Sequence, residues 1–178
     1  MPINGKPNLQ YILDECIEAG IKEFIFIISK NKLSIKKYFF NDSFYKKIIR
    51  KKKDKRLIQE FKKLKKYQKM IKFVYQNKPK GTGDAILKCK TLIKNKYFLM
   101  LLPDDLIIKK NCSKEMIRLH KKTGGSIIAT KRVDRKTVSR WGILSIINKK
   151  KKYFQIKDVV EKPSIKKAPS NFAIIGRY

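Results

Sequence analysis

The sequence predicts an α/β domain in which βα units are followed by a strand-rich extension, so that the strands form a mixed sheet. Short apolar runs alternate with amphipathic segments up to residue 122, and from Gly142 onward apolar segments are separated by lysine-rich turns. The 178 residues suit one domain with a core of its own, and 42% hydrophobic residues exclude a disordered chain. We find no internal repeat and no linker.

The first predicted elements are a helix and a strand. Residues 1–7 form a loop by their Pro and Gly content. From Asn8 the helical spacing i, i+3, i+4, i+7, i+8 places on one face the apolar residues Leu9, Ile12, Leu13, Cys16 and Ile17. Gly20 is expected to end this helix. The run FIFII at 24–28 predicts a buried strand, and residues 29–40 predict a loop and a short helix.

Residues 42–69 form a strongly basic segment with helical periodicity. Lysines cover most of it, and one face is apolar through Ile48, Ile49, Leu57, Ile58, Phe61 and Leu64. A basic amphipathic helix can bind a membrane surface or RNA. A solvated helix packed on the sheet explains the same pattern, and we favour that interpretation.

A strand is expected at 71–75, opening into a loop at Gln76. The loop KGTGDA at 80–85 then leads into a helix that carries Ile86, Leu87 and Leu92. Glycines ahead of a helix let a ligand approach the backbone and its free N–H groups. The loop has neither the Walker nor the GxGxxG spacing, so its sequence alone does not identify a phosphate site.

The stretch FLMLLPDDL at 98–106 is predicted to organise the site. Its five apolar residues at 98–102 suit a strand covered on both faces, which Pro103 ends because it has no N–H for the ladder. Asp104 and Asp105 follow at the carboxyl edge, where α/β sheets bind ligands. There a carboxylate can hold a divalent cation beside a phosphate. Alternatively, Asp104 caps the following turn.

The rest of the chain is predicted to be one helix and several strands. The helix covers residues 113–122 and ends at Gly124 and Gly125. Strands are expected at 126–130, 142–147, 154–160 and 171–178.

The charge is unusual, because 46 Lys and Arg residues against 14 Asp and Glu give a formal net charge of +32. Only seven of the basic residues are arginine, although arginine is the usual choice for bidentate contacts to nucleic acid. The many Lys, Ile, Asn, Phe and Tyr residues share A/T-rich codons, so genomic drift explains the charge at least as well as a polyanionic partner. Some non-specific affinity for nucleic acid or anionic lipid is expected at low salt.

The remaining residue types point to a soluble cytoplasmic protein. Cys16, Cys89 and Cys112 lack CxxC spacing, which is typical of reduced thiols. His120 lies between basic residues in a predicted helix and is interpreted as a surface residue. No signal peptide is visible, and no apolar run approaches the roughly 18 residues of a membrane span.

Several motifs occur in a consistent order: NGKPNLQYILDECIEAGI, YQ…GTGDA, LLPDD, TGGS, WGI, VEKP and PSNFAIIGRY. The series resembles the sugar-1-phosphate nucleotidylyltransferases, and most closely the bacterial UTP–glucose-1-phosphate uridylyltransferases. The resemblance implies a Rossmann-like, mixed, mainly parallel sheet flanked by helices, of the nucleotide-diphospho-sugar transferase type. It also implies an Mg²⁺-dependent reaction of UTP with glucose 1-phosphate that yields UDP-glucose and pyrophosphate.

The resemblance assigns roles to residues on the nucleotide side. Gln76 matches the position that reads the uracil edge, because an amide can donate and accept together. Gly81 matches the glycine whose backbone lies against the base. Asp104 matches the catalytic carboxylate that binds Mg²⁺ and bridges it to the phosphates. Asp84 stands where the pattern usually has His.

On the sugar side, Gly142, Glu161 and Ile174 match sugar-contacting positions. Glu161 is expected to accept from the sugar hydroxyls, and the other two act through backbone groups. Lys162 matches the catalytic cation on the sugar-side phosphate, while Trp141 replaces a Tyr of the pattern. Supporting structural roles are expected for Lys6, Asp105 and Asn171.

The family's glycine-rich loop, GxGTRxxPxTK, and the strand before it do not occur in this sequence. The segments that follow the PSNxAIxGRY motif in the family are also missing. We therefore expect residues 1–178 to be a single but incomplete nucleotidyltransferase domain with the first strand missing. An incomplete domain would result from a gene fragment, a misplaced start codon or one half of a split protein. We expect weak or no activity of the chain alone.

Other functions remain open. The chain could serve another sugar phosphate or dTTP, or be an inactive sugar-nucleotide-binding remnant or subunit. A basic nucleic-acid-binding module has only the charge in its favour. Expected partners are UTP and glucose 1-phosphate, with no specific nucleic acid and no membrane; a homo-oligomer or a partner that supplies the missing half is compatible with the sequence.

Overall fold

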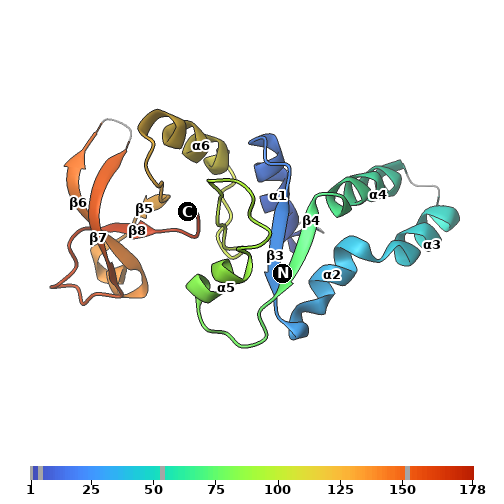
Figure 1. The fold of residues 1–178 in the computed structure, drawn as a ribbon, viewed down its shortest axis with the longest axis horizontal. Coiled ribbons are helices and arrows are strands. Elements are labelled where there is room, and N and C mark those ends of the chain that lie inside the picture. The colour runs from blue at the N-terminus through green and yellow to red at the C-terminus, as the bar shows by residue number, and fades with distance from the viewer. Residues whose placement is uncertain (1, 4–5, 53–54, 151–152) are drawn as a thin grey trace. The chain divides into compact units, whose positions relative to one another are not determined.

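A computed structural model describes residues 2–3, 6–52, 55–150 and 153–178 (Figure 1). The chain divides into two compact units, one made of Met1–Gly20 with Leu99–Tyr178 and the other of Ile21–Phe98. The expectation of a single domain over residues 1–178 stays a prediction. Helices and both parallel and antiparallel strand pairs are present, which confirms the α/β fold class.

The unit of residues 21–98 is built around a parallel strand pair. Strands β3 (Phe24–Ile28) and β4 (Ile71–Tyr75) pair in register from Phe24↔Ile71 to Ile28↔Tyr75. The connection between them contains the 3₁₀ helix η1 (Lys30–Lys32) and three helices, α2 (Leu33–Phe40), α3 (Asp42–Lys52) and α4 (Lys55–Gln68). Such a helical crossover is what parallel strands need. Helix α5 (Thr82–Lys88) follows β4.

Aromatic side chains form the core of this unit. Phe39 of α2 makes edge-to-face contacts with Phe26 of β3 and Tyr67 of α4, at centroid distances of 5.6 and 6.4 Å. Phe26 contacts Phe73 of β4 in the same way at 5.7 Å. Offset and edge-to-face pairs of this kind are favourable beyond the area that they bury. The helices and the strand pair are therefore held together by one aromatic cluster.

The basic segment predicted as one amphipathic helix consists of two helices, α3 and α4. Asp42, at the start of α3, accepts from Lys65 and from the Gln68 side chain of α4, the latter at 3.0 Å. Gln68 also donates to the Phe39 carbonyl at 2.7 Å. A continuous periodic pattern does not reveal where one helix ends and the next begins.

The second unit contains a four-stranded antiparallel sheet. Its strands are β5 (Thr130–Arg132), β6 (Gly142–Lys149), β7 (Phe154–Glu161) and β8 (Phe172–Ile174), in the order β5-β8-β6-β7. The 3₁₀ helix η2 (Arg135–Arg140) precedes β6. Ile143 and Ala173 pair across β6 and β8 and are fully buried together with Val138. The strands expected at 142–147 and 154–160 are thus confirmed, each slightly longer than predicted.

Two helices belong to the same unit. The short strands β1 (Pro2–Ile3) and β2 (Lys6–Pro7) precede α1 (Asn8–Glu18), and α6 (Cys112–Thr123) lies beside α1. The Asn111 side chain caps α6 by accepting from the Lys114 N–H, and it donates to the Glu15 carbonyl at 2.9 Å. Gly124 ends α6 with a φ of 70°, as its position predicted.

The strand predicted at 98–102 is much reduced. Only residues 100–102 pair with the backbone of 176–178, through hydrogen bonds of 2.8–2.9 Å and one bridge, Leu101↔Arg177. Tyr97 and Phe98 are 56% and 53% exposed, against the expectation of a strand covered on both faces. An apolar run gives a strand only where a neighbouring backbone pairs with it. In the described part of the chain no helix is long and apolar enough to cross a membrane.

Candidate functional site

Gln76, the predicted base-reading residue, lies at the carboxyl end of the parallel strand pair. Its backbone N–H donates to the Ile28 carbonyl at 3.0 Å, which continues the ladder by one residue beyond β4. Its side-chain Nε2 donates to the Gly81 carbonyl at 3.1 Å and to the Asp84 carboxylate at 2.7 Å. The strand ladder therefore fixes the backbone of Gln76, and the following loop fixes its side chain.

Gly81 occupies a backbone conformation that only glycine adopts without strain. Its φ of 89° and ψ of 176° lie in a region essentially restricted to glycine. Nothing lies within 4 Å of the place where a Cβ would stand, so the requirement comes from the backbone and not from crowding. The Gly81 carbonyl also accepts from the Ala85 N–H of α5 at 3.3 Å. The structure thus brings Gly81 next to Gln76, as both were predicted to contact the base.

Three predicted sugar-side residues, Gly142, Glu161 and Ile174, lie together. Gly142 begins β6 and is directly opposite Glu161, the last residue of β7. A Cβ on Gly142 would be 3.1 Å from the Glu161 carboxylate and 3.3 Å from Ile174 Cδ1. Glycine therefore keeps the backbone of 142 close to an exposed carboxylate and an aliphatic side chain.

Ile174 lies in β8, which has β5 on one side and β6 on the other. Antiparallel pairs alternate between hydrogen-bonded and non-hydrogen-bonded positions. Ile175 donates to the Ala129 carbonyl at 3.1 Å, and the next pair along is Thr130↔Ile174. The peptide groups of Ile174 therefore point away from β5 and toward β6, and the predicted role of its backbone stays a prediction.

Lys162 has an unusual backbone for a lysine. Its φ of 43° is positive, and it is the one such non-glycine residue in the described ranges. Its N–H donates to the Trp141 carbonyl at 3.0 Å, which holds the segment EKP against the start of β6. Its ammonium lies 3.8 Å from the Glu161 carboxylate, and both side chains are mostly exposed. A second cation, Lys131, lies 3.7 Å from the centre of the Trp141 ring.

The two aspartates of LLPDD have different surroundings. Asp105 accepts from the Gly176 N–H at 2.8 Å, which supports its predicted structural role. Asp104 is exposed, and its carboxylate has no hydrogen bond from any residue that the structure describes. Burial raises the pKa of Tyr178, and the carboxylates of Asp105, Glu161 and Asp104 raise it further. Asp104 and Glu161 thus lie within electrostatic reach of one phenol group.

The donor set fits a cation that is completed by substrate. Within the described ranges no group of three or more His, Cys, Asp and Glu residues is arranged to hold a metal ion. A dedicated protein cage is therefore not present there. Mg²⁺ in nucleotide enzymes is typically held by one or two carboxylates together with substrate phosphates. The free carboxylate of Asp104 meets that requirement.

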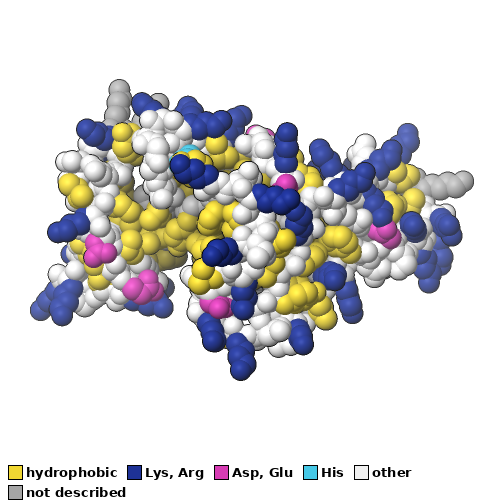
Figure 2. Space-filling view, viewed as in Figure 1, with side chains coloured by type: hydrophobic (Ala, Val, Ile, Leu, Met, Phe, Trp, Pro, Cys, Tyr) yellow, Lys and Arg dark blue, Asp and Glu magenta, His cyan; other side chains and the backbone are white. Residues whose placement is uncertain are grey.

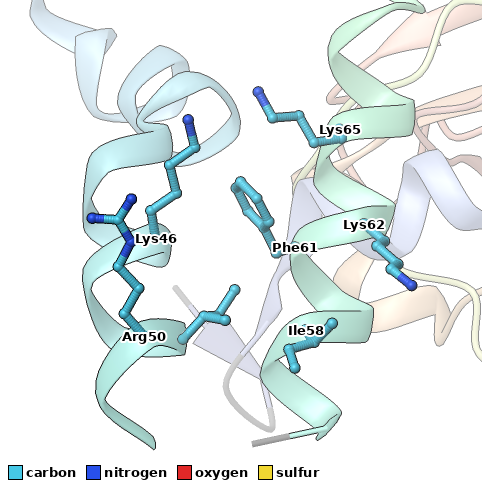
Figure 3. Close-up of a pocket in the computed structure, with 7 residues that line it drawn as sticks. Lys46, Arg50, Ile58, Phe61, Lys62 and Lys65 are labelled. Atoms are coloured by element: carbon cyan, nitrogen blue, oxygen red, sulfur yellow. The ribbon is translucent and has the colours of Figure 1, made fainter. Parts of the chain in front are cut away.

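Basic side chains also cover much of the surface elsewhere. Figure 2 shows Lys and Arg side chains spread over the face in view, with few acidic side chains among them. A groove of about 530 Å³ between α3 and α4 is lined by Lys46, Ile49, Arg50, Ile58, Phe61, Lys62 and Lys65, with Phe61 lying between the two helices (Figure 3). It contains none of the predicted site residues. Its lining therefore describes a basic surface separate from them.

Sequence reasoning missed two side-chain relationships near these residues. Asp84 was identified only as a departure from the family pattern, although it holds the Gln76 amide. Arg177 was read only as part of a motif, yet it is fully buried and donates to the Leu102 carbonyl at 3.1 Å, just ahead of Pro103. The sequence contained one clue to the role of Asp84, namely a carboxylate eight residues after Gln76, whose side-chain amide needs a fixed orientation to read a base.

Comparison with known proteins identifies the family of the chain. The family model described as "Nucleotidyl transferase" matches residues 1–178. UTP–glucose-1-phosphate uridylyltransferase 2 of Staphylococcus saprophyticus is 34% identical and the uridylyltransferase of Bacillus subtilis 32% identical, over 100% of this chain. The chain spans about 62% of the length of these relatives.

A crystal structure of apo UDP-glucose pyrophosphorylase has 33% identity and a TM-score of 0.85, over 99% of this chain and 66% of that one. The crystal structure of UDP-glucose pyrophosphorylase complexed with UDP-glucose has 32% sequence identity to this chain and a TM-score of 0.83.

Proposed function

Because the chain belongs to the nucleotidyl transferase family, we propose that it transfers a uridylyl group from UTP to glucose 1-phosphate and so forms UDP-glucose and pyrophosphate. The observation that carries the proposal is the close group of Gly142, Glu161 and Ile174. Because residue 142 has no side chain, none covers the exposed Glu161 carboxylate beside it, and a carboxylate accepts hydrogen bonds from hydroxyl groups. The names of the relatives add support, since they are uridylyltransferases.

In this reaction an oxygen of the sugar phosphate attacks the α-phosphorus of UTP. A P–O bond forms there as the bond to the pyrophosphate oxygen breaks, so pyrophosphate leaves with the electron pair. Such a displacement needs alignment and charge neutralisation more than proton transfer. Lys162 supplies a positive charge for the sugar-side phosphate, and Glu161 accepts hydrogen bonds from the sugar hydroxyls.

Gln76 and Gly81 hold the base in this proposal. The carbonyl, amide and backbone groups of the loop provide hydrogen bonds of defined direction, which is what discrimination between bases requires. Asp104 would hold Mg²⁺ together with the triphosphate. The ion supplies neutralisation of the phosphate charge and orientation of the phosphates.

We also propose a cytoplasmic location. Cys16, Cys89 and Cys112 are free thiols, and burial raises the pKa of each. Free, unreactive thiols are typical of reducing compartments.

The test is formation of UDP-glucose and pyrophosphate from UTP, glucose 1-phosphate and Mg²⁺. It is run on the chain as printed and on the same chain with the family's glycine-rich segment GxGTRxxPxTK added before Met1. We expect turnover with the added segment and little without it. UDP-glucose binding with no turnover in either preparation would indicate a binding subunit, and absence of both would contradict the proposal.

Matched variants separate the site from the general charge. Lys162→Ala is expected to lower kcat/KM by at least about tenfold, because it removes a cation from the reacting phosphate. Lys157→Ala makes the same charge change at an exposed position on β7 and serves as the control. Equal effects of the two variants would mean that only the net charge matters.

A further inference from the structure

Asp84 does more than occupy the first turn of α5, where an acidic side chain is favourable. It lies in the first turn of that helix, is half-buried, and directs its carboxylate to the Gln76 side chain. The 2.7 Å contact joins a carboxylate, which only accepts, to an amide that can present either its nitrogen or its oxygen. A carboxylate therefore decides which way the amide faces.

The Gly81 carbonyl also holds the nitrogen of the Gln76 amide. It also only accepts, and it lies 3.1 Å from the same Nε2 atom. The two N–H bonds of the Gln76 amide thus each have an acceptor, one at Gly81 ahead of α5 and one at Asp84 in its first turn. No residue in the described part of the chain donates to Gln76 Oε1, so that oxygen is the part of the amide left for a ligand.

The orientation matters for base choice. Uracil presents an N3–H donor between two carbonyls, whereas cytosine presents an N3 acceptor beside an amino group. An amide that is free to rotate by half a turn can match either edge. An amide held with its oxygen outward matches the N3–H of uracil and places an acceptor against the N3 acceptor of cytosine.

We propose that Asp84 is a positioning residue that fixes the orientation of the Gln76 amide and thereby selects uridine nucleotides over cytidine nucleotides. The inference rests on the proposed function, because it assumes that Gln76 meets the base. It assigns a role to one of the residues at which this chain departs from the pattern of its family. Asp84 itself does not touch the base in this account.

The test compares the dissociation constants of UDP and CDP for the whole chain, measured by isothermal titration calorimetry. The ratio of the two constants is the readout, because loss of folded protein or of one negative charge changes both constants alike. We expect the unmodified chain to prefer UDP, and Asp84→Ala to reduce that preference about tenfold, the size of effect that one hydrogen-bonding group exerts on selectivity.

Asp84→Asn keeps the size of the side chain but can either accept from or donate to the amide. We expect this variant to prefer UDP to an intermediate degree. It also keeps the test possible if Asp84→Ala does not fold. Preference for UDP that is unchanged in both variants would overturn the role of Asp84 while leaving the proposed function intact. Binding of neither nucleotide by the unmodified chain would overturn both.

Discussion

Gly176 lies so close to Leu102 that a Cβ on the glycine would stand 2.5 Å from the leucine Cβ. The same atom would be 3.2 Å from the Asp105 carboxylate, which accepts from the Gly176 N–H. Two segments far apart in the sequence therefore meet backbone to backbone, and the segment that carries Asp104 is held by that contact.

Gly176→Ala is predicted to destabilise the protein. The added methyl group meets the stem of a side chain, which cannot rotate away, so the two segments must separate at a cost of about 1–3 kcal/mol. Urea unfolding measures the effect. Gly125→Ala is the control, since the nearest atom to its Cβ is 4.0 Å away. Equal unfolding midpoints for the two variants would show that the contact is looser than described.

Glu15→Gln is predicted to cost about 3 kcal/mol or more of stability, because it leaves a buried charge without its partner. Glu15 lies 3.3 Å from the Arg177 guanidinium, and their side chains are 10% and 1% exposed. It also accepts from the Ser113 hydroxyl at 2.6 Å. The free energy of unfolding in urea is the measurement.

The control for this variant is Glu23→Gln. Glu23 pairs with Lys72 at 3.1 Å on the surface, where such pairs contribute less than about 1 kcal/mol. A loss of similar size in both variants would contradict a special role of the buried pair.

The Cys16 thiol is predicted to make stability depend on pH in the alkaline range. Burial raises the pKa of Cys16 from 9.0 to about 11, so the folded chain keeps its proton where the unfolded chain loses it. The contribution is full below the unfolded pKa and is lost as pH rises toward the folded value. The slope is at most about 1.4 kcal/mol per pH unit.

Cys16→Ala isolates this effect, because all other titrating groups are shared with the unmodified chain. The difference in free energy of unfolding between the two proteins is expected to shrink as pH rises from 9.0 toward about 11. A difference that stays constant over this range would mean that the thiol ionises as readily in the folded chain as in the unfolded one.

Gly81 and Gly83 offer a matched pair of glycine substitutions. Gly81→Ala forces a side chain into a φ of 89° and is predicted to cost about 1–2 kcal/mol and to weaken UDP-glucose binding. Gly83 lies within α5 with open space around its Cβ, so Gly83→Ala is predicted to be neutral or to stabilise by up to about 1 kcal/mol. Thermal unfolding and calorimetric titration measure the two effects, and the reverse order of stabilities would contradict the account.

Local patterns predicted the elements that depend on nearby residues. The helix from Asn8, the strand at 24–28 and the helix end at Gly124 are confirmed, since spacing, an apolar run and a glycine encode them locally. The strand predicted at 98–102 was wrong in extent, because among the described residues it pairs only with a short segment more than seventy residues further along the chain. A pattern does not contain the identity of a distant partner.

For the candidate site, too, the residues could be named from the sequence, but their contacts depend on segments that are distant along the chain. The resemblance supplied the names Gly142, Glu161 and Ile174, but their proximity comes from the β6–β7 register and the position of β8. The contact between Asp84 and Gln76 depends on how the chain folds back between β4 and α5, which a residue type alone does not predict.

The most direct test of the central claim is a titration of the ¹⁵N-labelled chain with UDP-glucose, followed by amide chemical shifts. The account predicts saturable shifts at Gly81, Gly142 and Lys162, with the α3–α4 residues Arg50 and Lys62 unchanged. Shifts confined to α3 and α4 and reproduced by pyrophosphate alone would contradict it, since they would show that the ligand binds only through the basic surface.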